Sequence, residues 1–200
     1  MRSEGLSLLS CGANVDTAAE AVESSSSRWN ASELETLLCT NGDYRSQGGM
    51  IGVLGRISAN RILLPSEDGI VSDTLSGVNT FTFTRSGTVT VSGETVQLIR
   101  GGEETFALRL LTNSFSLTSL CGLRAEEALE VVGENPCSAD VLLLDDRLAN
   151  DWQLLLSLCE AVQPSQILVT SNGYSEHGDS FGGIPLTLID WQGVSFRFMR

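Results

Sequence analysis

The chain of 200 residues has the length of a single domain, and its hydrophobic fraction of 42% is large enough for a buried core. No apolar run approaches the roughly 18 residues that a membrane span needs, and the N-terminal apolar stretch is too short for a signal peptide, so we expect a soluble domain. The net charge is −13 and all 12 basic residues are arginines scattered along the chain, which argues against tight binding of nucleic acid by this domain alone.

The first 60 residues predict alternating strands and helices. Leu6–Cys11 is predicted as a short apolar strand, and Asp16–Glu23 has the composition of a helix with an acidic first turn. We expect the serine run Ser24–Ser27 to interrupt this helix as a loop. Leu34–Thr40 is the next predicted strand, and the apolar residues of Met50–Ile57 follow helical spacing.

The middle of the chain predicts antiparallel strands. Arg61–Leu64 is a short apolar strand ended by a proline. From Val78 the apolar residues recur with a period of two, which is typical of strands. Val89–Leu98 contains a Ser-Gly-Glu turn between two such runs, and Phe106–Leu111 with Phe115–Leu120 makes a second predicted hairpin.

The next segment returns to helices and buried strands. Arg124–Val132 is predicted as a short helix, and Ala139–Leu144 is a nearly continuous apolar strand of the kind that is covered on both faces. Asn150 is the expected cap of a further helix that Pro164 ends. The predicted buried stripe of that helix comprises Trp152, Leu155, Leu156, Cys159 and Val162.

The C-terminal segment predicts a buried strand at Gln166–Thr170 and a hairpin formed by Ile184–Ile189 and Val194–Met199. Strands and helices thus alternate in each half of the chain, with hairpins between the halves. This order predicts an α/β fold in which two sheets are sandwiched between helices.

The stretch Leu37–Met50 resembles the metal-binding loop of the metallo-β-lactamase fold, in the version found in ComEC-type DNA-internalisation competence proteins. That version has an apolar strand, Thr, His-x-His-x-Asp-His, an apolar residue and Gly-Gly. Thr40, Gly48 and Gly49 keep the frame, with Gln47 in place of the apolar residue. The family's His, His, Asp and His are replaced here by Asn41, Asp43, Arg45 and Ser46.

Later segments resemble the same family in the same order. Gly122 ends a segment that resembles the hairpin carrying a bridging Asp, and it occupies the position of that Asp. Ser171–His177 resembles a Gly/Tyr/His loop, in which His177 is the one matching functional-loop histidine. The family's Pro-His-His-Gly-Ser is replaced here by Asp145, Asp146, Arg147, Leu148 and Ala149.

The resemblance implies a metallo-β-lactamase-like αββα sandwich of two mixed sheets between helices, formed as one domain by residues 1–200. The family's first strand, which carries a Gly-Gln-Gly-Asp turn, is expected to be absent because few residues precede Leu6. This leaves either a truncated chain, such as a soluble fragment of a larger membrane protein, or a sheet with an unpaired edge. An unpaired edge would invite pairing with another copy of the chain.

The replaced ligands imply a catalytically inactive domain with a structural or interaction role and no metal cofactor. Zinc hydrolases hold their ion with His, Cys and carboxylate ligands, and a single histidine cannot supply a two-metal site. By resemblance, the parent protein imports single-stranded DNA, and this domain lies on the extracellular side of a bacterial membrane. Its expected partner is a protein or the membrane part of that parent, with single-stranded DNA suggested by the resemblance alone.

Two alternatives retain catalysis. Asp43, Asp145 and Asp146 lie at or beside former ligand positions and suit Mn²⁺ or Mg²⁺, which would make the domain a nuclease or phosphodiesterase. Against this, Asp43 fits a turn, and the Asp145–Asp146 pair fits a cap on the following loop. His177 with a nearby Ser175, Ser180 or Glu176 would be a metal-free site, although the sequence has no Gly-x-Ser-x-Gly motif to support it.

Overall fold

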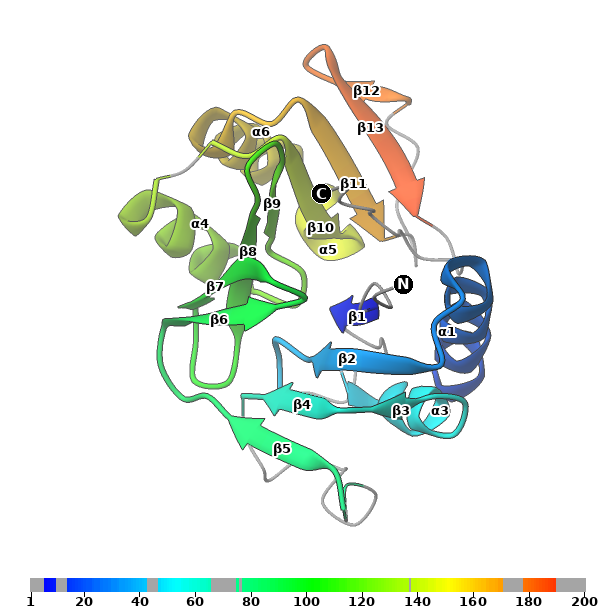
Figure 1. Cartoon of the computed structure of the whole chain (residues 1–200). Coiled ribbons are helices and arrows are strands. Elements are labelled where there is room, and N and C mark those ends of the chain that lie inside the picture. Colours follow the sequence, from blue (N-terminus) through cyan, green and yellow to red (C-terminus); the bar gives the residue numbers. More distant parts are fainter. Residues whose placement is uncertain are drawn as a thin grey trace.

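The computed structural model describes residues 6–9, 14–42, 47–65, 75, 77–136, 138–170 and 178–189. Two sheets pack face to face, and helices cover the outer side of each (Figure 1). None of the helices in these ranges is long and apolar enough to cross a membrane.

The first sheet contains the N-terminal strands in the order β1 (Leu6–Leu9), β2 (Glu33–Leu38), β4 (Arg61–Leu64) and β5 (Asn79–Thr82), with β3 (Ser58–Ala59) beside β2. Each described pair in it is parallel. Parallel neighbours need a crossover between them, and two helices serve here as parts of those connections. In the described part of this sheet β1 pairs with β2 alone.

Helices α1 (Val15–Trp29) and α3 (Met50–Leu54) pack on the outer face of the first sheet. Asn14 caps α1, because its side-chain oxygen accepts a hydrogen bond from the Thr17 N–H at 2.9 Å. The core under these helices includes Ala18, Val22, Leu34, Leu37, Met50, Val53 and Ile62.

The predicted loop at Ser24–Ser27 is wrong, because α1 continues through the serine run to Trp29. Serine is a weak helix former, but these serines lie on partly or fully exposed positions, and the Ser26 hydroxyl donates to the Glu23 carbonyl oxygen at 3.0 Å. The helix ends where Asn30 adopts the left-handed conformation at φ 50° and its N–H reaches back to the last turn.

The second sheet begins with an antiparallel meander of β6 (Gly87–Val91), β7 (Glu94–Arg100), β8 (Phe106–Leu111) and β9 (Ser116–Ser119). Both hairpins predicted from the period-two pattern are confirmed. The first turns through Ser92 and Gly93, which both have positive φ.

The same sheet continues with parallel strands β10 (Val141–Asp145), β11 (Gln166–Thr170) and β13 (Ile184–Ile189). The short strand β12 (Ser180–Phe181) pairs antiparallel with β13. The predicted partner Val194–Met199 lies outside the described residues. The second sheet therefore mixes both kinds of pairing, as expected.

Helices α4 (Ala125–Glu134), α5 (Asp146–Ala149) and α6 (Trp152–Val162) cover the outer face of the second sheet. The predicted cap of α6 is wrong by one residue: Asp151 accepts hydrogen bonds from the N–H groups of Gln153 and Leu154, both at 3.1 Å. Asn150 instead ends α5, a short helix that the sequence pattern did not reveal.

The predicted buried stripe of α6 is wrong at two positions. Trp152 is 58% exposed and Leu156 is 42% exposed, whereas Leu154 and Leu158 are buried beside Leu155. The helix is apolar almost all round, so its period alone did not define which side faces the sheet.

Three separate apolar clusters establish the layer order. One lies under α1 and α3, one lies under α4, α5 and α6, and the third fills the space between the sheets. In the third cluster, the rings of Phe83 and Phe106 meet edge to face with centroids 4.8 Å apart. The predicted α/β sandwich of two sheets between helices is therefore confirmed.

Candidate functional site

The sequence-predicted positions come together where β2, β9 and β10 end. Asn41 follows β2, Gly122 follows β9, and Asp145 is the last residue of β10. Asn41 also forms an isolated antiparallel bridge with Thr105, which ties the end of the first sheet to the β7–β8 loop of the second. Side chains at the carboxyl ends of strands are where α/β folds commonly place chemistry.

Asn41 and Gly122 are in direct contact. The Asn41 side chain is fully buried, and a Cβ atom built on Gly122 would lie 1.6 Å from its Nδ2 atom. Gly122 also has φ +85°, a conformation that other residues rarely adopt. The carboxamide at a former histidine position therefore fills the space that a side chain at the former aspartate position would need.

The amides around this contact are buried and incompletely hydrogen-bonded. Gln47 is 1% exposed, and its Nε2 atom donates to the Asn41 backbone oxygen at 3.2 Å. Among the described residues, its Oε1 atom has no hydrogen-bond partner, and the same holds for Asn41 Nδ2 and Oδ1. Buried polar atoms without a hydrogen-bond partner cost free energy, so the Asn41 amide is an unfavourable group at this position.

Asp145 is held by the protein itself. Its Oδ2 atom accepts from the Gly122 N–H and from Arg147 Nη2, each at 2.9 Å, and its Oδ1 atom accepts from the Leu148 N–H at 3.1 Å. Its side chain is 13% exposed. The cap interpretation of Asp145 is thus confirmed, because the carboxylate is the N-cap of α5.

Arg147 brings a permanent positive charge to a position where the family has histidine. Its guanidinium pairs with Asp145 and its side chain is 48% exposed. A guanidinium has no lone pair to offer a metal ion and repels a cation. Asp146, the remaining acidic residue of this segment, lies half-buried in the first turn of α5.

Cys121 is a neighbour of this centre that the sequence patterns did not single out. Burial raises the pKa of its thiol to about 12; the Asp145 carboxylate adds to this effect, and a hydrogen bond with Ser119 and the charge of Arg147 oppose it. A thiol with a pKa raised in this way stays protonated at neutral pH, so it is a poor nucleophile there. The one feature of the sequence that could have indicated Cys121 is its position directly before Gly122.

The structure brings together Asn41, Gly122, Asp145 and Arg147 of the predicted positions. The others, Asp43, Arg45, Ser46 and His177, lie outside the described residues, as do Ser175 and Glu176 of the metal-free alternative. Ser180 is described and lies in β12.

The residues of this centre do not fit a zinc ion. They offer an amide, a glycine and a guanidinium where the fold's hydrolases need His and carboxylate ligands, and the carboxylate that is present already accepts from its own neighbours. Across the described part of the chain, no three His, Cys, Asp or Glu side chains gather as metal ligands would.

No protein-family model and no curated protein matches the sequence of this chain. Its structure resembles a diphosphatase of the PhnP family at 12% identity, with a TM-score of 0.60 over 100% of this chain and 82% of the other. It also resembles a metallo-β-lactamase from Pontibacter korlensis at 14% identity, with a TM-score of 0.54 over 72% and 75% of the two chains.

A CmlA β-hydroxylase is similar at 10% identity and a TM-score of 0.52, over 69% of this chain. This chain spans only 36% of that larger protein. At such identities the likeness shows the fold alone, and the expected metallo-β-lactamase fold is confirmed.

Proposed function

We propose that this chain is a catalytically inactive domain of the metallo-β-lactamase fold with a structural or interaction role. The observation that carries the proposal is the contact between Asn41 and Gly122. These two residues stand at positions where the resembled family has metal ligands. The Asn41 carboxamide packs against Gly122 and so occupies space that a ligand side chain at position 122 would need. The Arg147–Asp145 pair supports the proposal, because it neutralises the nearest carboxylate.

We further propose that the domain belongs to a ComEC-like DNA-uptake protein as a single unit of residues 1–200. The sequence frame Thr40, Gly48 and Gly49 supports this parentage. The domain would then lie on the extracellular side of a bacterial membrane, with the membrane part of its parent or another protein as its partner. The net charge of −13 favours a protein partner over single-stranded DNA. The proposal includes no cofactor.

The competing candidate is a Mg²⁺ or Mn²⁺ nuclease or phosphodiesterase with a site made of Asp43, Asp145, Asp146 and His177. The hydrogen bonds to Asp145 weigh against this candidate. A metal ion would have to displace Arg147 from the Asp145 carboxylate or share that carboxylate with it. Two members of the set, Asp43 and His177, lie outside the described residues.

One experiment separates the two candidates. The purified chain is dialysed against Zn²⁺ or Mn²⁺ and then against metal-free buffer, and bound metal is measured by elemental mass spectrometry. We expect less than about a tenth of an ion per chain, because the described residues of this centre offer an amide, a glycine and a guanidinium, and the Asp145 carboxylate already accepts three hydrogen bonds. In parallel, hydrolysis of single-stranded DNA is measured with the same protein.

The matched control is the double variant Asp43→Asn with Asp146→Asn. Near-stoichiometric Mn²⁺ in the original chain that disappears in the double variant would overturn the proposal and establish the carboxylate site. DNA hydrolysis that the same double variant abolishes would do so as well.

A further inference from the structure

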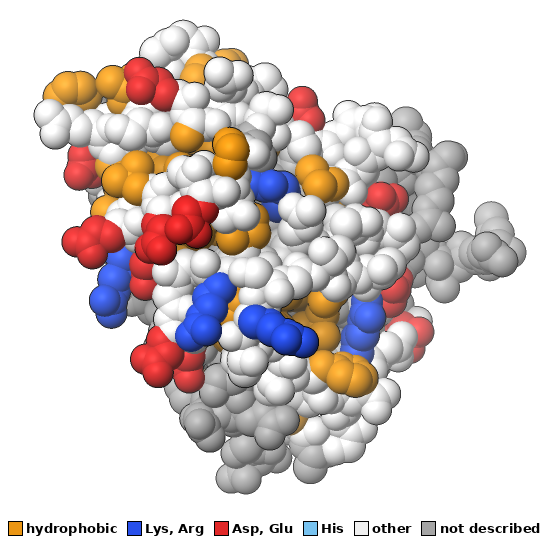
Figure 2. Space-filling model, turned by 90° about the vertical axis from the view of Figure 1, so that its left-hand side faces the viewer, with side chains coloured by type: hydrophobic (Ala, Val, Ile, Leu, Met, Phe, Trp, Pro, Cys, Tyr) orange, Lys and Arg blue, Asp and Glu red, His pale blue; other side chains and the backbone are white. Residues whose placement is uncertain are grey.

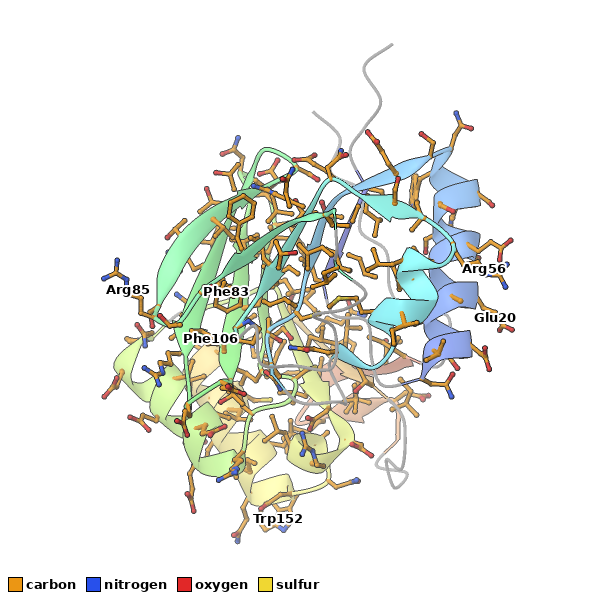
Figure 3. All side chains as sticks on the ribbon, turned by 90° about the horizontal axis from the view of Figure 1, so that it is seen from below. Glu20, Arg56, Phe83, Arg85, Phe106 and Trp152 are labelled. Atoms are coloured by element: carbon orange, nitrogen blue, oxygen red, sulfur yellow. The ribbon has the colours of Figure 1, made fainter. Side chains whose placement is uncertain are left out.

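The outward face of α4 and α6, which we call the α4–α6 face, carries large apolar side chains in contact with solvent. Trp152 and Leu156 lie one helical turn apart on α6, and they are 58% and 42% exposed. Leu129 on the neighbouring helix α4 is 42% exposed. Figure 3 shows Trp152 at the outer edge of the molecule, pointing away from the sheets. Tryptophan is mostly buried in proteins and is enriched at the centres of interfaces.

The charged side chains within α4 and α6 are all acidic, and the exposed Arg124 at the N-cap of α4 is the basic residue next to them. Glu126, Glu130 and Glu134 follow one another at i, i+4 spacing along the exposed side of α4, and Glu160 is exposed on α6. Neither helix contains a basic residue. Figure 2, in which the α4 side of the molecule faces the viewer, shows acidic and hydrophobic side chains interleaved over its upper left.

The acidic row is locally unfavourable for the free domain. Like charges four residues apart repel each other and weaken a helix, and a glutamate in the last turn opposes the helix dipole. A binding partner that places positive charge along this row would remove the repulsion. The pattern therefore points to a ligand of opposite charge.

The same charges exclude other occupants of the α4–α6 face. A second copy would bring its own −13 charge and the same acidic row against this one. Nucleic acid and anionic lipid surfaces are repelled for the same reason. By contrast, a segment with one cationic side and one apolar side could contact both the glutamates and the exposed apolar side chains of this face.

We propose that the α4–α6 face binds a basic, amphipathic helical segment of a partner protein, with Trp152 and Leu156 as apolar anchors and Glu126, Glu130 and Glu160 as charge contacts. This inference rests on the proposed role as an interaction domain and names the chemistry of the partner. Such a helix would lay its apolar side along α6 and its lysines or arginines over the acidic rim.

The test uses the whole chain and a synthetic helical peptide with leucines on one side and lysines on the other, with binding measured by isothermal titration calorimetry. Removing the anchors in the double variant Trp152→Ser with Leu156→Ser should weaken binding by about tenfold or more, as at interface hot spots. The matched control is Phe81→Ser, which removes a side chain of 54% exposure from β5 in the other sheet and should leave the affinity unchanged.

A second variant separates a charge contact from a general effect on folding. Glu130→Gln should weaken peptide binding and its salt dependence, while it stabilises the free domain slightly by removing repulsion along α4. A peptide with glutamates in place of the lysines should not bind.

Equal affinity for the anchor variant and the Phe81→Ser control would overturn the proposal, as would equal binding of the acidic peptide. Self-association of the chain in sedimentation that the anchor variant abolishes would assign the face to a second copy instead. Metal binding and DNA hydrolysis are read separately, so a failure of the inactive-domain proposal would be seen without any change in peptide binding.

Discussion

The carboxamide of Asn41 packs on the backbone of Gly122, in the space that any side chain at position 122 would need. In the family that this chain resembles, these positions hold a histidine and a bridging aspartate. The exchange of both residues gives a complementary pair, because the missing side chain of Gly122 makes room for the buried amide of Asn41. The contact therefore belongs to the packing of the domain.

Gly122→Ala should destabilise the domain by roughly 2–4 kcal/mol, since the new Cβ would collide with Asn41 and the backbone would be strained at φ +85°. The measurement is the free energy of unfolding from urea titration. In an Asn41→Ala background the collision disappears, so the cost of Gly122→Ala should fall to the backbone strain of about 1–2 kcal/mol. Equal costs in the two backgrounds would contradict the contact.

Asn41→Leu should leave stability unchanged or raise it. The buried carboxamide finds no hydrogen-bond partner for its Nδ2 or Oδ1 atoms among the described residues, and an apolar group of similar shape avoids the cost of leaving them unpaired. Urea unfolding of this variant checks the expectation. A loss of more than about 2 kcal/mol would mean that ordered water or a bound group satisfies the amide.

Asp145→Ala should lower the free energy of unfolding by roughly 2–4 kcal/mol. The change removes the N-cap of α5 and leaves the N–H groups of Gly122 and Leu148 without their acceptor. The adjacent Asp146→Ala is the matched control and should cost less, about 0.3–1 kcal/mol, because it removes only a favourable charge from the first turn of α5. Similar losses for both variants would show that Asp145 has no special role.

Cys121 and Cys159 should react slowly with iodoacetamide. Burial raises the pKa of Cys121 to about 12 and that of Cys159 to about 11, so the reactive thiolate is scarce near pH 8. Labelling followed by peptide mass spectrometry should show both thiols at least about tenfold slower than in the urea-unfolded chain. Rapid labelling of the partly buried Cys121 in the folded chain would contradict the raised pKa of its thiol.

Asp140 should make stability depend on acid pH. The hydroxyl and backbone N–H of Ser116 donate to its Oδ2 atom at 2.8 and 2.7 Å, and these hydrogen bonds lower the pKa of the carboxyl. A lowered folded pKa stabilises the fold above the unfolded pKa of about 3.9, and the effect is lost as the pH falls through the folded value.

Because Asp140 is exposed, the contribution should be below about 1 kcal/mol at pH 7. Asp140→Asn should therefore destabilise the domain slightly at pH 7 and not at all below the folded pKa. Urea unfolding at a series of pH values measures the difference. A difference between the two chains that does not change with pH would contradict this assignment.

The sequence by itself determined the order and kind of most elements, and its resemblance to a known family led to the prediction of replaced ligand positions. Period-two patterns identified the hairpins around Ser92 and Thr112, and continuous apolar runs identified β10 and β11. These features depend on neighbours in the chain, where side-chain periodicity carries the information. The alternation of strands and helices then led to the layered sandwich.

Only the tertiary structure decided which residues meet. In the structure α1 continues through the serine run, Trp152 and Leu156 face solvent, and Asn41 packs on Gly122. The Gly122 N–H also donates a hydrogen bond to the Asp145 carboxylate, which lies 23 positions away in the sequence. Local propensity is worth fractions of a kilocalorie per residue, whereas packing and burial between distant segments are worth more, and those contacts have no period that a sequence displays.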